Sequence, residues 1–342
     1  MISRDNLRGI AGVMVAISII GTIHLLKPGI SAAPNFACGS TSGQIAEIDV
    51  RTGETGSEIA RELADKGVTA SFESFFRVAV GDSRSGRIAP GLHKIDMEIC
   101  ATDALLQLLD PKRIGNLLAI NEGAWSSEVA SKLSLIGYSK KEISEAFKNM
   151  ERPKTFSSLE GLLFPAQYSF DSGTSVSKIL QMMISRGIKE LGIAGLSQGQ
   201  GKFNSQQLLT IASLIQAEGD TKDFSKISRV IRNRLASGMR LQFDSTIHYI
   251  KGTRGSVFLS TKSTLLNSPF NTYQRYGLPP GPINNPGSDA MYAATHPATG
   301  KWLYFITVAP RDTRFTDSLD EFNNWKILYK KNLRAGKFGG KR

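Results

Sequence analysis

A single carboxylate stands where an apolar residue is expected. Glu218 follows a segment that predicts a helix over residues 204–217, with Asn204 or Ser205 as its N-cap. Apolar residues lie three, four and seven positions before Glu218 and share its helix face: Ile215, Leu214 and Ile211. Apolar surroundings raise the pKa of a carboxyl, which then stays protonated at neutral pH and can donate its proton. Protonation of a glycosidic oxygen requires such a group.

A structural interpretation of Glu218 stays open on this pattern alone. A Glu in the last helical turn can bend toward solvent or pair with a nearby base, and three arginines follow it: Arg229, Arg232 and Arg234. The helix dipole disfavours a negative charge at a C-terminus, and this weighs against the structural alternative.

The elements predicted around that helix are of α+β type. Helical spacing of apolar residues predicts further helices over residues 174–192 and 224–235. A long loop rich in Pro, Gly and Asn separates them from the last part of the chain. Residues 302–308 predict a buried strand, and residues 313–316 predict a strand that pairs with it.

Several longer motifs occur in order along the chain. They are LEGLLFPAQY at 159–168, ASLIQAE at 212–218, RNRLASGMRLQFDST at 232–246, SPFNTY at 268–273, GLPPGPI at 277–283 and NPG at 285–287. These segments resemble the motifs LEGYLFPDTY, ASIVEKE, NRL…GM.LQ.DPT, SPYNTY and GLPPGPI.NPG of the YceG-like, MltG-type endolytic murein transglycosylases. The resemblance covers most of the chain, from residue 45 to residue 325.

This resemblance implies a lytic transglycosylase that cuts the MurNAc–GlcNAc bond within peptidoglycan glycan strands. Glu218 matches the second Glu of ASIVEKE, which would make it the catalytic acid and then the base. It would protonate the leaving oxygen and then take the proton of the MurNAc 6-hydroxyl, which attacks C1 and leaves a 1,6-anhydro end. One carboxylate would then suffice where a hydrolase normally uses two. The resemblance further implies that such an enzyme ends the elongation of nascent strands.

Polar residues of the same motifs are implied to line the sugar groove: Gln242, Asp244, Asn271 and Tyr273. Each of them also has a structural alternative: Asp244, for example, can cap a helix, and Asn271 can anchor the Pro- and Gly-rich loop. No cofactor and no metal are expected. The sequence has no phosphate-binding Gly loop and no metal-ligand motif, and its four histidines are dispersed.

The chain departs from the family pattern at several positions. Ala166 and Gln167 replace Asp-Thr of FPDTY, and Gln216 replaces the first Glu of ASIVEKE. Ser245 replaces the Pro of DPT, and Phe322 stands where the family usually has a His. No role of that His can be carried over to this chain. None of these changes removes the acid.

Two other functions compete with the transglycosylase. One is a catalytically silent glycan-binding or scaffold protein of the wall-synthesis machinery, which two internal repeats favour. The other is a hydrolase that uses Glu218 and Asp244 as a carboxylate pair. The products formed from peptidoglycan separate all three.

The repeats are strand–turn–helix units about 70 residues apart, over residues 50–63 and 120–133. They resemble LysM-type glycan-binding modules. The predicted organisation is therefore an α+β chain with an N-terminal transmembrane helix, LysM-like modules and an α+β catalytic domain. Its parts are a cytoplasmic N-terminus (1–8), a transmembrane helix (9–26), a stalk (27–44), the LysM-like region (45–155), the catalytic domain (156–325) and a basic tail (326–342).

The N-terminal segment carries the membrane prediction. Residues 9–26 have no formal charge and are just long enough to cross a bilayer, and Arg4 and Arg8 precede them. This arrangement predicts a single-pass anchor with a cytoplasmic N-terminus and an extracytoplasmic catalytic domain. A cleaved signal peptide is the alternative, because Ala32 and Ala33 are small residues near a cleavage position.

The two cysteines, Cys38 and Cys100, would both lie outside the membrane and could pair there. Two free thiols are an equally open interpretation, because nothing in the sequence determines the distance between them.

The net charge of +12 first suggests an anionic partner. However, residues 326–342 hold seven Lys or Arg and no acid, so the rest of the chain carries only +5. With no zinc spacing or other nucleic-acid signature, a nucleic-acid partner is not expected. The expected partners are peptidoglycan glycan strands, the membrane and, through the family resemblance, peptidoglycan polymerases and other wall-synthesis proteins.

Overall fold

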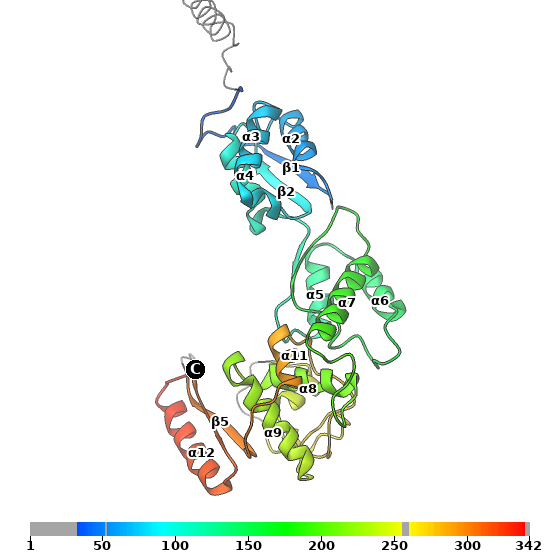
Figure 1. Ribbon diagram of the computed structural model, residues 1–342, viewed down its shortest axis with the longest axis vertical. Helices are drawn as coiled ribbons and strands as arrows, with labels where there is room; N and C mark the ends of the chain where they lie inside the picture. The colour runs from blue at the N-terminus through cyan, green and yellow to red at the C-terminus, as the bar shows by residue number, and fades with distance from the viewer. Residues whose placement is uncertain (1–32, 52, 255–259, 339–342) are drawn as a thin grey trace, which may run out of the picture. The chain divides into compact units, whose positions relative to one another are not determined.

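The computed structural model describes residues 33–51, 53–254 and 260–338 (Figure 1). The described residues form two compact units, which are divided between Ile114 and Gly115. Both combine helices with two-stranded antiparallel sheets, which confirms the predicted α+β class.

The first unit contains a strand–helix–helix–strand repeat. Its elements are β1 (Ile45–Val50), α2 (Gly56–Asp65), α3 (Phe72–Gly81) and β2 (Gly91–Asp96), followed by α4 (Ala101–Leu108). Strands β1 and β2 pair in antiparallel register from Ile45 opposite Asp96 to Val50 opposite Gly91. The alternating inward residues of β1, Ile48 among them, join the apolar faces of the three helices in one core. We call β1–α2–α3–β2 the first repeat.

The segment before β1 is attached to this unit. Cys38 and Cys100 form a disulfide with Cα atoms 4.8 Å apart, which settles the alternative that the sequence left open. Asn35 Oδ1 accepts a hydrogen bond from the backbone N–H of Ala101, and the Ser71 hydroxyl donates to the Pro34 carbonyl. Residues 34–44, predicted as part of a stalk, therefore contact the folded unit.

The second unit begins with the same order of elements, which we call the second repeat. It comprises β3 (Leu117–Ala119), α5 (Ser126–Leu135), α6 (Lys140–Asn149) and β4 (Gln167–Ser169). Strands β3 and β4 are antiparallel. The apolar residues of this repeat belong to the same core as those of the helices that follow it. The division between the units thus falls after Ile114, and residues 115–155, predicted with the LysM-like region, lie in the second unit.

The first helix of each repeat has a glutamate in its first turn that binds the N-cap backbone. Thr55 caps α2, because Thr55 accepts from the Glu58 N–H while the Glu58 carboxylate accepts from the Thr55 N–H. Trp125 precedes α5 as its N-cap, and its backbone N–H is bound by Glu128.

The rest of the second unit contains the three predicted helices and the two predicted strands, together with α10, α11 and α12, which were not predicted. It comprises α7 (Val176–Ile193), α8 (Ser205–Glu218), α9 (Phe224–Ala236), α10 (Asp244–Lys251), α11 (Ser288–Thr295), β5 (Tyr304–Ala309), β6 (Asp312–Thr316) and α12 (Leu319–Arg334). Strands β5 and β6 pair as predicted, but β5 is only half-buried, with Val308 as its one buried residue. The predicted basic tail begins inside α12.

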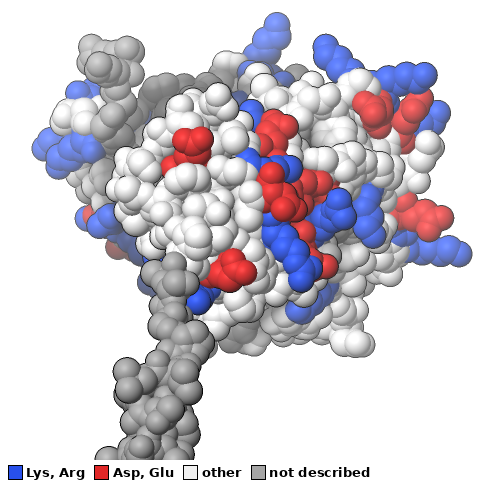
Figure 2. All heavy atoms as spheres, turned by 90° about the horizontal axis from the view of Figure 1, so that it is seen from above, with Lys and Arg blue, Asp and Glu red and all other residues white. Residues whose placement is uncertain are grey.

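Charge is mixed on the face shown in Figure 2, where Lys and Arg side chains lie beside Asp and Glu. Within residues 33–51, 53–254 and 260–338, no helix has the length and apolar character needed to cross a membrane. The predicted transmembrane segment, residues 9–26, lies outside the described residues.

Candidate active site

Helix α8 places Glu218 at its last position. The helix begins at a capping box in which Asn204 Oδ1 accepts from the Gln207 N–H at 2.9 Å and the Gln207 side chain binds the Asn204 N–H. It ends at Gly219, where a Cβ atom would lie 2.3 Å from Ile227 Cδ1. A larger residue at 219 would require the end of the Ile227 side chain to move, so α9 packs close to the end of α8.

The Glu218 carboxyl is partly buried and bound by one hydroxyl. Ser245 Oγ, on α10, donates to Glu218 Oε1 at 2.5 Å. Burial raises the pKa of Glu218 to about 7; the Ser245 hydrogen bonds oppose this, the charge of Asp244 adds to it, and the charge of Arg234 opposes it. Such a group is present in both protonation states near neutral pH.

The arginine pairing considered from the sequence is not present in the described part of the chain, where Glu218 has no ion pair within 4.0 Å. Arg234 is 7% exposed and donates to the carbonyls of Leu241 and Leu303. Its guanidinium acts on the pKa of Glu218 only through its field. A buried cation thus faces the carboxyl without neutralising it by contact.

Asp244 and Tyr273 form a hydrogen-bonded pair near Glu218. The Tyr273 hydroxyl donates to Asp244 Oδ1. Burial and this contact raise the pKa of the Tyr273 phenol, and the charge of Glu218 adds to the effect. Asp244 is also the first residue of α10, where the helix dipole favours a negative charge, although Phe243 is the N-cap.

Gln242 is exposed and has a left-handed backbone, with φ of 51°. This conformation costs a non-glycine residue of order 1–3 kcal/mol. The loop is held from both sides, because the Gln242 N–H binds the Thr272 carbonyl at 3.1 Å and Arg234 binds the Leu241 carbonyl. The side chain of Gln242 is therefore presented by a constrained turn next to the Tyr273 segment.

Asn271 is fully buried, and its amide is used within the loop. Its Nδ2 donates to the carbonyls of Thr264 at 3.1 Å and Leu266 at 2.7 Å, while its Oδ1 accepts from the Tyr273 N–H at 2.9 Å. These contacts describe the anchoring role that the sequence offered as its alternative. The side chain acts on the site by positioning Tyr273.

Two further residues went unpredicted: the hydroxyl that binds Glu218 and a second buried acid. Ser245 was noted only as a departure from the family pattern, and its contact with Glu218 joins residues 27 positions apart. Glu160 is 9% exposed and burial raises its pKa to about 7. It accepts from the Ser126 N–H at 3.0 Å and from Asn285 Nδ2 at 3.1 Å. An acid within the otherwise apolar segment LEGLLF was the available signal for Glu160.

The match to known proteins covers most of the chain. The YceG-like family matches residues 48–326. The chain belongs to the YceG-like family. An endolytic murein transglycosylase of Bacillus subtilis (strain 168) is 32% identical over 305 residues, which cover 82% of this chain and 84% of that protein. An endolytic murein transglycosylase of Streptococcus pneumoniae (strain R6) is 34% identical over 153 residues, 43% of this chain and 28% of its own.

A solved structure shares the fold of this YceG-like chain. The crystal structure of a yceG-like protein from Listeria monocytogenes aligns with a TM-score of 0.56 and 26% identity. The alignment covers 83% of this chain and 99% of that one.

Two of the residues at which this YceG-like chain departs from the family pattern, Gln216 and Phe322, have defined contacts. Gln216 Oε1 accepts from the Gly287 N–H at 2.9 Å, which ties the end of α8 to the start of α11. Phe322 stacks on Tyr304, with ring centroids 5.2 Å apart. Arg234 lies over the same Tyr304 ring, 5.5 Å from its centroid. The Phe322 ring therefore packs against Tyr304, over whose ring the buried Arg234 guanidinium lies.

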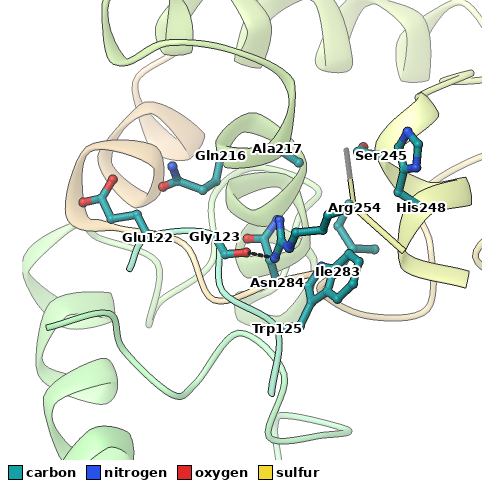
Figure 3. Close-up of a pocket in the computed structure, with 10 residues that line it drawn as sticks. All are labelled: Glu122, Gly123, Trp125, Gln216, Ala217, Ser245, His248, Arg254, Ile283 and Asn284. Atoms are coloured by element: carbon teal, nitrogen blue, oxygen red, sulfur yellow. Dashed lines mark hydrogen bonds between the residues drawn. The ribbon is translucent and has the colours of Figure 1, made fainter. Parts of the chain in front are cut away.

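A cavity of about 320 Å³ is lined by Ala217 and Ser245, while Glu218 itself is not among its lining residues (Figure 3). Ser245, which binds Glu218, lines it together with residues of the segment before α5, the end of α8, helix α10 and the 283–284 segment. Ligand pockets have volumes of this order. Ser245 therefore both binds the catalytic candidate, Glu218, and lines a cavity.

Proposed function

We propose that this chain is an endolytic lytic transglycosylase that cleaves the MurNAc–GlcNAc bond within peptidoglycan strands and leaves 1,6-anhydro-MurNAc ends. The observation that carries the proposal is the Glu218 carboxyl: burial raises its pKa to about 7, and it binds Ser245, a residue that lines a cavity. Membership of the YceG-like family and relatives named endolytic murein transglycosylase support it.

One carboxyl serves both proton transfers in this reaction. Protonated Glu218 gives its proton to the leaving GlcNAc oxygen as the C1–O bond breaks. Its carboxylate then accepts the proton of the MurNAc 6-hydroxyl as the C1–O6 bond forms, so the acid is regenerated and no water is consumed. The Ser245 hydrogen bonds and the field of Arg234 favour the carboxylate in the second step, while burial favours the acid in the first.

The product analysis distinguishes this reaction from its two alternatives. Full-length protein in detergent micelles is incubated with peptidoglycan, and the fragments are identified by mass spectrometry. Anhydro-MurNAc ends within short strands are expected. Reducing ends would instead indicate a hydrolase that pairs Glu218 with Asp244, although Asp244 already binds the Tyr273 hydroxyl. Intact strands would indicate a glycan-binding scaffold.

We further propose that the first repeat is a LysM-like glycan-binding module. A cavity of about 480 Å³ is formed by the residues around the β1–α2 and α3–β2 connections, including Arg51, Gly56 and Phe76. A soluble chito-oligosaccharide should therefore perturb amide signals of these connections in an NMR titration. An unchanged spectrum would remove the module assignment and leave the catalytic proposal standing.

The cellular placement is also a proposal. The uncharged run at 9–26, preceded by Arg4 and Arg8, supports a single-pass anchor with the catalytic unit outside the cytoplasm. In that place the enzyme would meet nascent strands and their polymerases and would end strand elongation. A protease added to intact spheroplasts should digest a C-terminal tag, whereas a protected tag would contradict this orientation.

A further inference from the structure

The second half of helix α12 and the turn that follows it carry bases and no acid. Five bases lie in this part of the chain: Lys326, Lys330, Lys331, Arg334 and Lys337. All five side chains are exposed, and none of them forms an ion pair within the part of the chain that the structure describes. Uncompensated charge of one sign creates a local potential that attracts anions.

The bases within the helix share one face of α12. At 3.6 residues per turn, the four of them lie within an arc of about 140°. Ile327 lies in the same arc and is 68% exposed. The opposite side packs on β5, where the buried Asn332 donates through Nδ2 to the Val308 carbonyl at 2.8 Å (Figure 1). This contact determines the rotation of α12 about its axis, so the basic face, formed by the four bases and Ile327, points away from β5.

Helix electrostatics account for only part of the basic face. The helix dipole favours bases in the last turn, where Lys331 and Arg334 lie. Lys326 and Lys330 precede that turn and share the face nonetheless. The dipole also gives no reason for the exposed apolar side chain of Ile327 between them. The combination of one charge sign with an exposed apolar residue therefore indicates a ligand that is both anionic and apolar.

A bilayer that contains anionic lipids has both properties. Clusters of four to eight bases on an amphipathic helix attract its phosphates, and each base near the surface tightens binding about fivefold. An apolar layer lies directly beneath those phosphates, and apolar side chains of surface helices enter it. A soluble polyanion offers phosphates without such a layer, so it would leave Ile327 without a function.

We propose that the basic face of α12 binds the anionic headgroups of a lipid bilayer, with its bases on the phosphates and Ile327 inserted between them. The inner side of the same helix lies near the candidate site. Burial raises the pKa of the Tyr329 phenol on α12, and the charge of Asp244 adds to this effect. A bilayer bound to α12 would therefore lie on the opposite side of this helix from Asp244. The binding goes beyond the proposed reaction and does not depend on it.

The test measures binding to vesicles. Full-length protein is placed in nanodiscs of neutral phosphatidylcholine, which accommodate the predicted anchor, and is sedimented with sucrose-loaded vesicles at low ionic strength. The vesicles contain phosphatidylcholine alone or together with phosphatidylglycerol. The anionic vesicles should be bound about 1,000-fold more tightly, as five bases predict. This preference should fall as salt is added, because salt screens exposed charges.

A triple variant removes three bases of the basic face: Lys330→Gln, Lys331→Gln and Arg334→Gln. It should weaken binding to the anionic vesicles about 100-fold. The matched control removes three exposed bases of α6, where two acids accompany them: Lys140→Gln, Lys141→Gln and Lys148→Gln. Both variants change the net charge equally, so the control should keep the preference. An equal loss in the control would show that net charge alone drives binding and would overturn the proposal.

Ile327→Ser separates a bilayer from a soluble polyanion. It should weaken vesicle binding about tenfold, because an apolar side chain no longer leaves water. Binding to poly(glycerol phosphate), a soluble polyanion, should be weaker and should not respond to this change. Vesicle binding that survives the α12 triple variant would overturn the proposal. Binding that ignores Ile327→Ser and is as tight for poly(glycerol phosphate) would assign the face to an anionic polymer and overturn it too. None of these measurements involves cleavage, so their failure would leave the proposed function standing.

Discussion

The first repeat and the second repeat follow the same order of elements, yet they bury their apolar faces in different ways. The first has six-residue strands and closes its own core with α4 and a disulfide. The second has three-residue strands, and its core continues into α7, α8 and α11. The short second sheet has too little surface to form a core alone, so it depends on the helices of the catalytic region.

This difference determines where the site is formed. In the second repeat the β3–α5 connection is paired with a distant segment: the Gly123 N–H binds the Asn285 carbonyl at 2.8 Å, and Asn285 Nδ2 binds the Ala124 carbonyl at 2.9 Å. The connection thereby becomes one wall of the cavity next to Ser245. The same local pattern can therefore form an independent module or part of an active site, depending on what packs against its loops.

The largest loss of activity is expected from Glu218→Gln in the second unit, whereas substitutions in the first unit should leave the activity unchanged. This change removes the proton donor and should lower the rate of anhydro-end formation by about 10³-fold, within the usual contribution of acid–base catalysis. The melting temperature should change little, because the amide keeps the shape and can still accept from Ser245. The matched control is Glu73→Gln, an exposed acid of the first repeat, which should keep full activity. Activity retained by Glu218→Gln would contradict the assignment.

Removing the disulfide should affect the first unit alone. The bridge closes a loop of 62 residues, and Cys38→Ser with Cys100→Ser should lower the free energy of unfolding of that unit by about 4 kcal/mol on the chain-entropy estimate. Denaturant unfolding followed by hydrogen exchange can separate the two units. The first should lose protection at lower denaturant, while the exchange of α8 should not change. An equal loss in both units would show that they fold as one.

Asn285→Ala should destabilise the second unit and leave the stability of the first unit unchanged. The buried Asn285 side chain accepts from the N–H groups of Gly161 and Leu163, each at 2.9 Å, and donates to Ala124 and Glu160. Its loss leaves several buried groups unpaired, so the unfolding free energy of this unit should fall by about 3 kcal/mol. The disulfide unit should keep its stability. Asn324→Ala, at an exposed site on α12, serves as control.

Local patterns predicted much of this architecture, and long-range pairings explain the rest. The periodicity of ASLIQAE placed Glu218 at the end of an apolar helix, because that signal lies within a few turns. The pairing of Cys38 with Cys100 and the contact between Ser245 and Glu218 join positions with no local signal between them. A further long-range contact joins the second repeat to the catalytic unit: Asn285 Nδ2 donates to the carbonyl of Ala124, 161 residues away.

The smallest effect is expected at Ser245, the position that corresponds to Pro in the DPT motif quoted in the sequence analysis. Glu218 must be protonated in the free enzyme, so the descending limb of the kcat/KM profile at high pH follows its pKa. Ser245 lowers that pKa through its hydroxyl and its backbone N–H. Ser245→Ala removes the first donor, and Ser245→Pro removes both, because proline has no N–H.

The descending limb should therefore move to higher pH in the order wild type, Ser245→Ala, Ser245→Pro, while Ser245→Thr, which keeps both donors, should match the wild type. The field of Asp244 and that of Arg234 act on Glu218 in all four proteins, so they cancel in the comparison. Equal profiles for all four would mean that Ser245 does not tune the acid. Loss of a donor to a carboxylate favours its protonated form and therefore raises its pKa. A descending limb that moves to lower pH in Ser245→Ala would contradict the hydrogen bond from Ser245 to Glu218.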